Sequence, residues 1–131
     1  MSKIRCFVSC DYRNDESRKA LLAELSRRTD SPFEVCDYST NENVPNWEQN
    51  VRERIRHSGV VIVLCGRHTD TAPGVTEEVK IAQEEGVDYF FLNAYGDADD
   101  VKEPISAKLS DRIHAWSWDN LVKMIHGDRQ E

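Results

Sequence analysis

Glu78 stands out because it occupies an inward-facing position in a helical pattern. Successive residues lie about 100° apart around a helix axis, so Val75, Val79 and Ala82 mark the arc that packs on a neighbouring layer. Glu78 falls inside this arc, whereas Glu77 falls on the solvent side. An inward carboxylate near a helix N-terminus can stabilise a developing positive charge or hold a hydroxyl group. The plainer interpretation is that Glu78 only complements the helix dipole.

Short apolar runs alternate with helical patterns along the whole chain. Strands are predicted at 3–10, 33–36, 59–65, 88–94 and 113–116. Helices are predicted over 74–85, 104–109 and 118–125. Two more are predicted earlier in the chain: one begins at 14–16 and carries Leu21, Leu22 and Leu25, and the other begins after Asn46 and carries Trp47, Val51 and Ile55. The unbroken apolar run at 59–65 is typical of a strand covered on both faces. Asn46 and Gln49 match a capping box at the start of the second helix.

This alternation predicts an α/β fold formed by a single domain spanning residues 1–131. Short connections favour right-handed crossovers and a parallel sheet with helices on both faces. The best match is a flavodoxin-like, doubly wound, five-strand sheet of order 2-1-3-4-5. Sites in such sheets lie at the carboxyl ends of the strands, where the winding reverses between strands 1 and 3. That rule selects 9–15, 39–47 and 66–78, the last of which contains Glu78.

Composition excludes several classes of partner. The net charge of −7 argues against nucleic-acid binding. No apolar stretch approaches the roughly 18 residues of a membrane span, and the N-terminus resembles a strand and not a signal peptide, so we expect a cytoplasmic protein without membrane contact. The four cysteines form no C-x-x-C pair, and neither they nor the four histidines have metal-ligand spacing, so no disulfide and no metal site is expected.

The chain lacks the sequence motifs that mark the common functions of doubly wound folds. The loop after the first strand has no G-x-G-x-x-G, and no P-loop occurs in the chain. A receiver domain needs an aspartate at the end of strand 3, where this chain has Cys65. The loop at 10–15 is also a poor match to the phosphate loop of flavodoxins.

Five segments in order resemble the TIR-like domain of the bacterial Thoeris antiviral type, from Lys3 to about Tyr95. They are Phe7-Val8-Ser9-Cys10-Asp11-Tyr12, Asp37 with Ser39, Trp47, Val61-Ile62-Val63-Leu64-Cys65-Gly66 with Thr69, and Val75-x-x-Glu78-Val79-x-x-Ala82. The chain departs from the family pattern at two positions where the family commonly has aromatic residues. These positions hold Cys10 and Glu77.

The resemblance implies an enzyme of the NAD nucleosidase or ADP-ribosyl cyclase type. In this family the glutamate supports cleavage of the nicotinamide–ribose bond of NAD, and that role carries over to Glu78. NAD is then the substrate, and no cofactor is implied. The product would be ADP-ribose, a cyclised form or a conjugate, which signals to a separate effector protein in antiviral defence. The resemblance also allows for self-assembly of the chain.

The same resemblance implies a set of substrate-binding residues around Glu78. They are Ser9, Cys10, Asp11 and Tyr12 at the floor of the pocket, Ser39 and Trp47 closing it, and Gly66 and Thr69 contacting phosphate. Plainer interpretations stand beside these. Trp47 has a core explanation, Gly66 ends a strand, and Asn14 and Asp15 are helix caps.

Two other functions fit the sequence. Nucleoside deoxyribosyltransferases have a related fold and a nucleophilic glutamate, and they are similar in the segment Glu78-Val79-x-x-Ala82, but this chain lacks their Gly/Pro-rich first loop. A non-catalytic interaction module is the other alternative, because many TIR domains act only by assembling. In that case Glu78 is structural.

Overall fold

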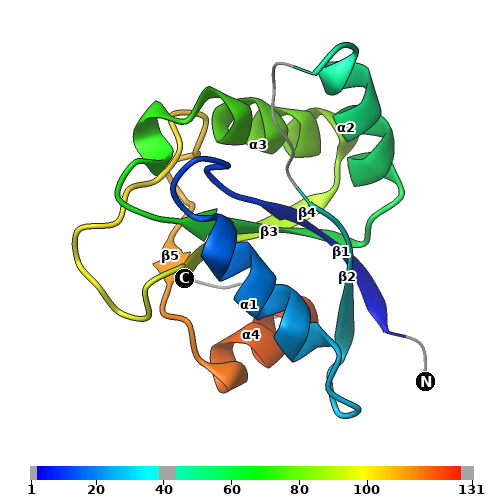
Figure 1. Ribbon diagram of the computed structural model, residues 1–131, viewed down its shortest axis with the longest axis vertical. Coiled ribbons are helices and arrows are strands. Elements are labelled where there is room, and N and C mark those ends of the chain that lie inside the picture. The colour runs from blue at the N-terminus through cyan, green and yellow to red at the C-terminus, as the bar shows by residue number, and fades with distance from the viewer. Residues whose placement is uncertain (1–2, 39–43, 128–131) are drawn as a thin grey trace.

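The protein folds as a five-strand sheet with α-helices on both of its faces (Figure 1), in a computed structural model that describes residues 3–38 and 44–127. The strands are β1 (Ile4–Ser9), β2 (Phe33–Tyr38), β3 (Val60–Cys65), β4 (Asp88–Asn93) and β5 (Ile113–His114). The helices are α1 (Glu16–Ser26), α2 (Trp47–Arg56), α3 (Pro73–Glu85) and α4 (Trp118–Ile125). Each predicted strand is present, with β2 longer and β5 shorter than its apolar run.

All strand pairs are parallel, and the order is β2-β1-β3-β4-β5. This confirms the predicted flavodoxin-like topology. Figure 1 shows α2 and α3 on one face of the sheet and α1 and α4 on the other. The winding reverses at β1, which lies between β2 and β3, so the carboxyl ends of β1 and β3 border the crevice where sites form in such folds.

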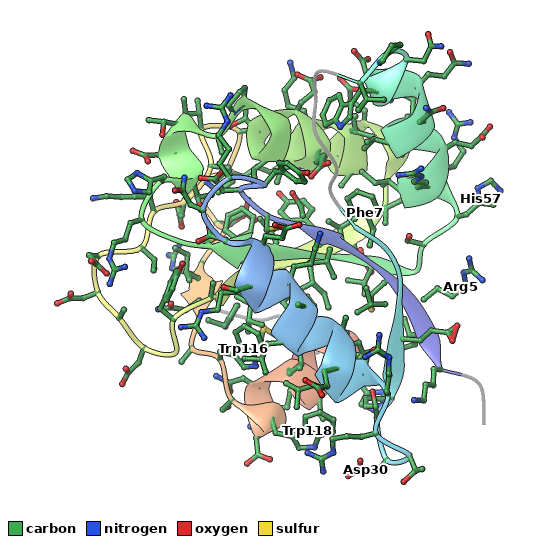
Figure 2. The ribbon with its side chains drawn as sticks, in the orientation of Figure 1. Arg5, Phe7, Asp30, His57, Trp116 and Trp118 are labelled. Atoms are coloured by element: carbon green, nitrogen blue, oxygen red, sulfur yellow. The ribbon has the colours of Figure 1, made fainter. Side chains whose placement is uncertain are left out.

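The central strand β3 is buried along its whole length, as its sequence predicts. Val61, Val63 and Cys65 face the core under α2 and α3, and Val60, Ile62 and Leu64 face the core under α1 and α4. On the second face, the turn before β2 is tied to α4. Arg28 stacks 4.2 Å from the ring centroid of Trp118 and pairs with Asp30 (Figure 2).

Two local predictions are wrong. Residues 104–109 form turns and not a helix, because Ile105 and Leu109 are 77% and 101% exposed and offer no buried face. Asn46 does precede α2, but its side chain makes no capping hydrogen bond. Its backbone is left-handed with φ of 60°, whereas a capping side chain needs an extended backbone. Among the described residues, no helix has the length and apolar character required to cross a bilayer.

Ion pairs join the exposed surfaces of α2 and α3. Arg52 donates to Glu84 and Glu85 at 2.8 Å each, and Arg56 donates to Glu85 at 3.0 Å. The hydrogen bonds from Arg56 and Arg52 lower the pKa of Glu85 from its ordinary 4.5 to about 2. These contacts fix the end of α3 remote from Glu78.

We expect the Glu85 contacts to weaken in acid. A carboxylate with a lowered pKa stabilises the fold fully above its unfolded value and loses that effect as the pH falls towards the folded value. The melting temperature of the wild type should therefore exceed that of Glu85→Gln at pH 6, and the difference should shrink between pH 4.5 and about 2. Thermal unfolding of both proteins across this pH range measures the difference in melting temperature. A constant difference would contradict the assignment, and added salt should reduce the difference at pH 6 because the pairs are near the surface.

Candidate active site

Glu78 is fully buried, with 0% of its surface exposed. It lies on α3 among Val75, Val79 and Ala82, which are buried with it, whereas Glu77 is only partly buried. The helical spacing therefore separated the two glutamates correctly. A polar group of this kind is tolerated in a core only where it is hydrogen-bonded.

Ser9 supplies a hydrogen bond to that carboxylate. Its Oγ donates to Oε1 of Glu78 at 2.6 Å, and the Ser9 side chain is also 0% exposed. Ser9 is the last residue of β1 and pairs with Val63 of β3. The carboxylate thus meets the sheet beside the reversal point between β1 and β3, where the fold predicts a site.

The arrangement is a carboxyl group held in a site that is closed to solvent. In such surroundings, a carboxylate interacts with a nearby positive charge far more strongly than it does in water. Burial also has a second consequence. A ligand can reach the Glu78 carboxylate only after the segments around the carboxyl ends of the strands move apart.

The other predicted residues of the first loop do not join Ser9 and Glu78. Asp11 accepts the backbone N–H of Arg13 at 3.1 Å and the Asn14 side-chain amide at 2.7 Å, so its carboxylate organises the loop itself. Tyr12 is 40% exposed. Cys10 belongs to the core under α1 and α4, opposite to α3, and burial raises the pKa of its thiol to about 12.

Gly66 and Thr69 contact each other. The Gly66 N–H donates to Thr69 Oγ1 at 2.7 Å, the Gly66 carbonyl accepts the backbone N–H of Lys102 at 2.9 Å, and Thr69 is fully buried. These groups build the turn after β3. In this arrangement the N–H of Gly66 is already paired, and the hydroxyl of Thr69 is buried.

Trp47 has the core position that its plainer interpretation predicts. It packs against the core under α2 and α3, and its indole Nε1 is buried with no hydrogen-bond partner in the described structure. A buried indole N–H is usually paired, so this donor is an exception among the described residues. Ser39 lies outside the described residues.

Asp15 is a second buried carboxylate that the sequence did not reveal. It was predicted to cap α1, but it makes no side-chain capping bond there and is 1% exposed. Its Oδ1 accepts the hydroxyl of Tyr95 at 2.6 Å, and its Oδ2 is buried without a hydrogen-bond partner. Burial raises the pKa of Asp15, and the Tyr95 bond opposes that effect. Its partner is 80 residues away, so no local pattern could have identified it.

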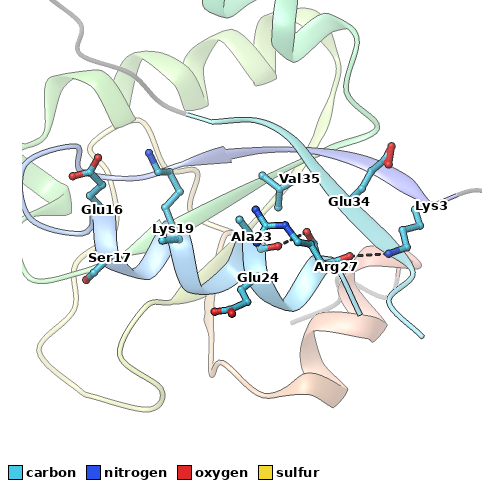
Figure 3. A pocket seen from close by; sticks show the side chains of 11 residues that line it. Lys3, Glu16, Ser17, Lys19, Ala23, Glu24, Arg27, Glu34 and Val35 are labelled. Carbon is cyan, nitrogen blue, oxygen red and sulfur yellow. Dashed lines mark hydrogen bonds between the residues drawn. The ribbon is translucent and has the colours of Figure 1, made fainter. Parts of the chain in front are cut away.

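The described residues contain no group of three or more His, Cys, Asp or Glu side chains able to hold a metal. An open groove runs between α1 and the edge strand β2, lined by residues that include Lys3, Lys19, Arg27 and Glu34 (Figure 3). None of the described site residues lines this groove. The candidate site is therefore the buried Glu78–Ser9 pair and the loops that cover it.

A family model described as Thoeris protein ThsB, TIR-like domain, matches residues 7–99. The match covers well over half of the 131 residues and includes Ser9, Asp15, Gly66, Glu78 and Tyr95. No curated protein matches the chain.

Proposed function

The chain belongs to the family of the Thoeris ThsB TIR-like domain, and from this premise we propose that it cleaves the nicotinamide–ribose bond of NAD. The observation that carries the proposal is the buried hydrogen bond from Ser9 to Glu78 at the reversal point of the sheet. It supports the proposal because a single oriented carboxylate in a dry site is what this reaction needs.

The reaction needs no general acid. When the bond between the ribose C1′ and the pyridinium nitrogen breaks, both electrons pass to the nitrogen, and nicotinamide leaves as a neutral molecule. The ribose becomes an oxocarbenium ion, whose positive charge the Glu78 carboxylate stabilises directly or by holding the ribose hydroxyls. Water then adds to C1′ and releases a proton, which gives ADP-ribose. An internal nucleophile or another acceptor would give a cyclic or conjugated product instead.

The reaction also needs an opened state of the protein. Glu78 has no exposed surface, so NAD must displace the segments above it before the carboxylate can contact the ribose. On closure around the substrate, the indole N–H of Trp47 gains the partner that it lacks. The product then acts as a diffusible signal for a separate effector protein in antiviral defence.

We expect Ser9→Ala to lower kcat while leaving KM for NAD nearly unchanged. The Ser9 hydroxyl donates to the carboxylate at 2.6 Å, so its loss lets Glu78 rotate. Loss of one hydrogen bond to a charged group corresponds to about 1.5–3 kcal/mol, or roughly 10- to 100-fold in rate. Ser9→Thr keeps a hydroxyl at the same place and should retain more of the rate than Ser9→Ala. Equal losses in both variants would contradict the positioning role.

The proposed function is tested by incubating the protein with NAD and identifying the products by mass spectrometry. Release of nicotinamide with an ADP-ribose-derived product supports it. A parallel incubation with deoxynucleosides tests base exchange, which a deoxyribosyltransferase would catalyse. A protein that is inert towards NAD when concentrated and in the presence of its trigger would overturn the proposal.

The complete burial of Glu78 favours a second candidate function, a non-catalytic module that acts by assembling. In that case, Glu78 and Ser9 only join α3 to β1. The Glu78→Gln variant separates the two candidates, because an assembling module would keep its biological activity when the charge is removed.

A further inference from the structure

Two guanidinium groups lie against one tyrosine ring at the carboxyl edge of the sheet. The Cζ of Arg18 is 4.6 Å and the Cζ of Arg67 is 5.2 Å from the ring centroid of Tyr95. Arg18 lies in the first turn of α1, Arg67 follows Gly66 at the end of β3, and Tyr95 follows β4. Three separate elements therefore bring these side chains together.

The tyrosine is held firmly. Its hydroxyl donates to the buried carboxylate of Asp15 at 2.6 Å, and its backbone N–H donates to Asn93 Oδ1 at 2.9 Å. Asp15 in turn packs against Gly66, where even a methyl group would lie 2.6 Å from its Oδ2. The ring is thus a fixed platform for both arginines.

Stacking leaves the guanidinium edges available. A guanidinium that packs its face on an aromatic ring keeps its N–H donors in the plane of the group, where they can bind phosphate oxygens in pairs. Arg67 is 55% exposed and forms an ion pair with Asp100, which is 50% exposed. An ion pair this exposed contributes little, so a stronger anion can replace the aspartate.

The platform is close to the candidate active site. Ser9 is the last residue of β1, Gly66 follows the neighbouring strand β3, and Asp15 packs against Gly66. A dinucleotide with its ribose at Glu78 also needs donors for its diphosphate. Gly66 and Thr69 do not offer them, because the Gly66 N–H already donates to Thr69 Oγ1 and Thr69 is fully buried.

We propose that Arg18 and Arg67, stacked on Tyr95, bind the diphosphate of a dinucleotide and of the ADP-ribose product, and that Asp100 occupies Arg67 in the absence of ligand. The identity of the ligand rests on the proposed function. The anion site itself rests on the stacking geometry and the exchangeable ion pair. Binding of ADP-ribose therefore tests it without any need for turnover.

The experiment measures calorimetric binding of ADP-ribose and of adenosine, which lacks phosphate, to the wild type and four variants. Arg18→Gln and Arg67→Gln should each weaken ADP-ribose binding about tenfold, the size expected for a hydrogen bond between charged groups. Asp100→Asn should tighten it, because the competing carboxylate is gone. Adenosine binding should be the same in all of these proteins.

Arg28→Gln is the matched control. Arg28 also stacks on an aromatic ring, Trp118, and pairs with an aspartate, Asp30, but it lies at the turn before β2. Its replacement should leave ADP-ribose binding unchanged. Equal affinities in Arg67→Gln and Arg28→Gln, no tightening in Asp100→Asn, or no binding of ADP-ribose to the wild type would each overturn the inference. A protein that binds ADP-ribose through Arg67 but does not consume NAD would uphold this site while rejecting the proposed function.

Discussion

Replacing Glu78 with glutamine is expected to abolish NAD consumption while leaving the melting temperature nearly unchanged. Glutamine has the same shape, and its side-chain oxygen can still accept the Ser9 hydroxyl that now bonds Oε1 at 2.6 Å. Only the negative charge is lost. Since that charge opposes the oxocarbenium ion in the transition state, we expect a rate loss of about 10³-fold or more. Nicotinamide release and thermal unfolding, measured on the same preparation, check both parts.

Glu77→Gln provides the control for this experiment. It changes the same residue type one position away, on a side chain that is only partly buried. We expect full NAD consumption from this variant. Equal activity in the two variants would show that Glu78 is structural, and a large drop in the melting temperature of Glu78→Gln would show that its charge supports the fold.

The pattern of apolar residues was sufficient to predict the sheet and the direction of Glu78. Strand β3 is apolar without interruption because helices cover both of its faces, and the spacing of Val75, Val79 and Ala82 places Glu78 on the inner side of α3. Both are consequences of regular geometry, in which sequence spacing determines the direction of a side chain. The handedness of the connections limits the possible strand orders, and the observed order is the one that best matched the five predicted strands.

Contacts between distant loops could not be predicted in the same way. Asp15 looks like a helix cap in the sequence, yet its carboxylate bonds to Tyr95 and packs on Gly66. Gly66 looks like a phosphate contact, yet its N–H bonds to Thr69. Short polar residues bond equally well to local backbone or to remote side chains, and only the tertiary fold decides between the two.

Cys10 is a difference from the family whose effect depends on where the tertiary fold places the side chain. The family commonly has an aromatic residue at this position. The Cys10 side chain lies in the core under α1 and α4, on the opposite side of β1 from the Ser9–Glu78 bond. The difference therefore changes core packing beneath α1.

The contact between Asp15 and Gly66 predicts a large effect on stability. A methyl group at position 66 would lie 2.6, 2.7 and 2.9 Å from the two oxygens and the Cγ of Asp15. The carboxylate cannot easily retreat, because it is 1% exposed and bonded to Tyr95 at 2.6 Å. We therefore expect Gly66→Ala to lower the free energy of unfolding by about 1–3 kcal/mol, as overpacked cores do.

The double variant Gly66→Ala, Asp15→Ala identifies the cause. Asp15→Ala alone removes the acceptor of the Tyr95 hydroxyl and should itself destabilise the protein, but it also removes the atoms that the new methyl group would meet. Introduced into that background, Gly66→Ala should have little further effect, so the two changes should be strongly non-additive. Denaturant unfolding of the four proteins gives the coupling energy. Additive effects would mean that Gly66 is required for its backbone alone, whereas strong coupling would show that the loops after β1, β3 and β4 are held together through the buried Asp15 carboxylate.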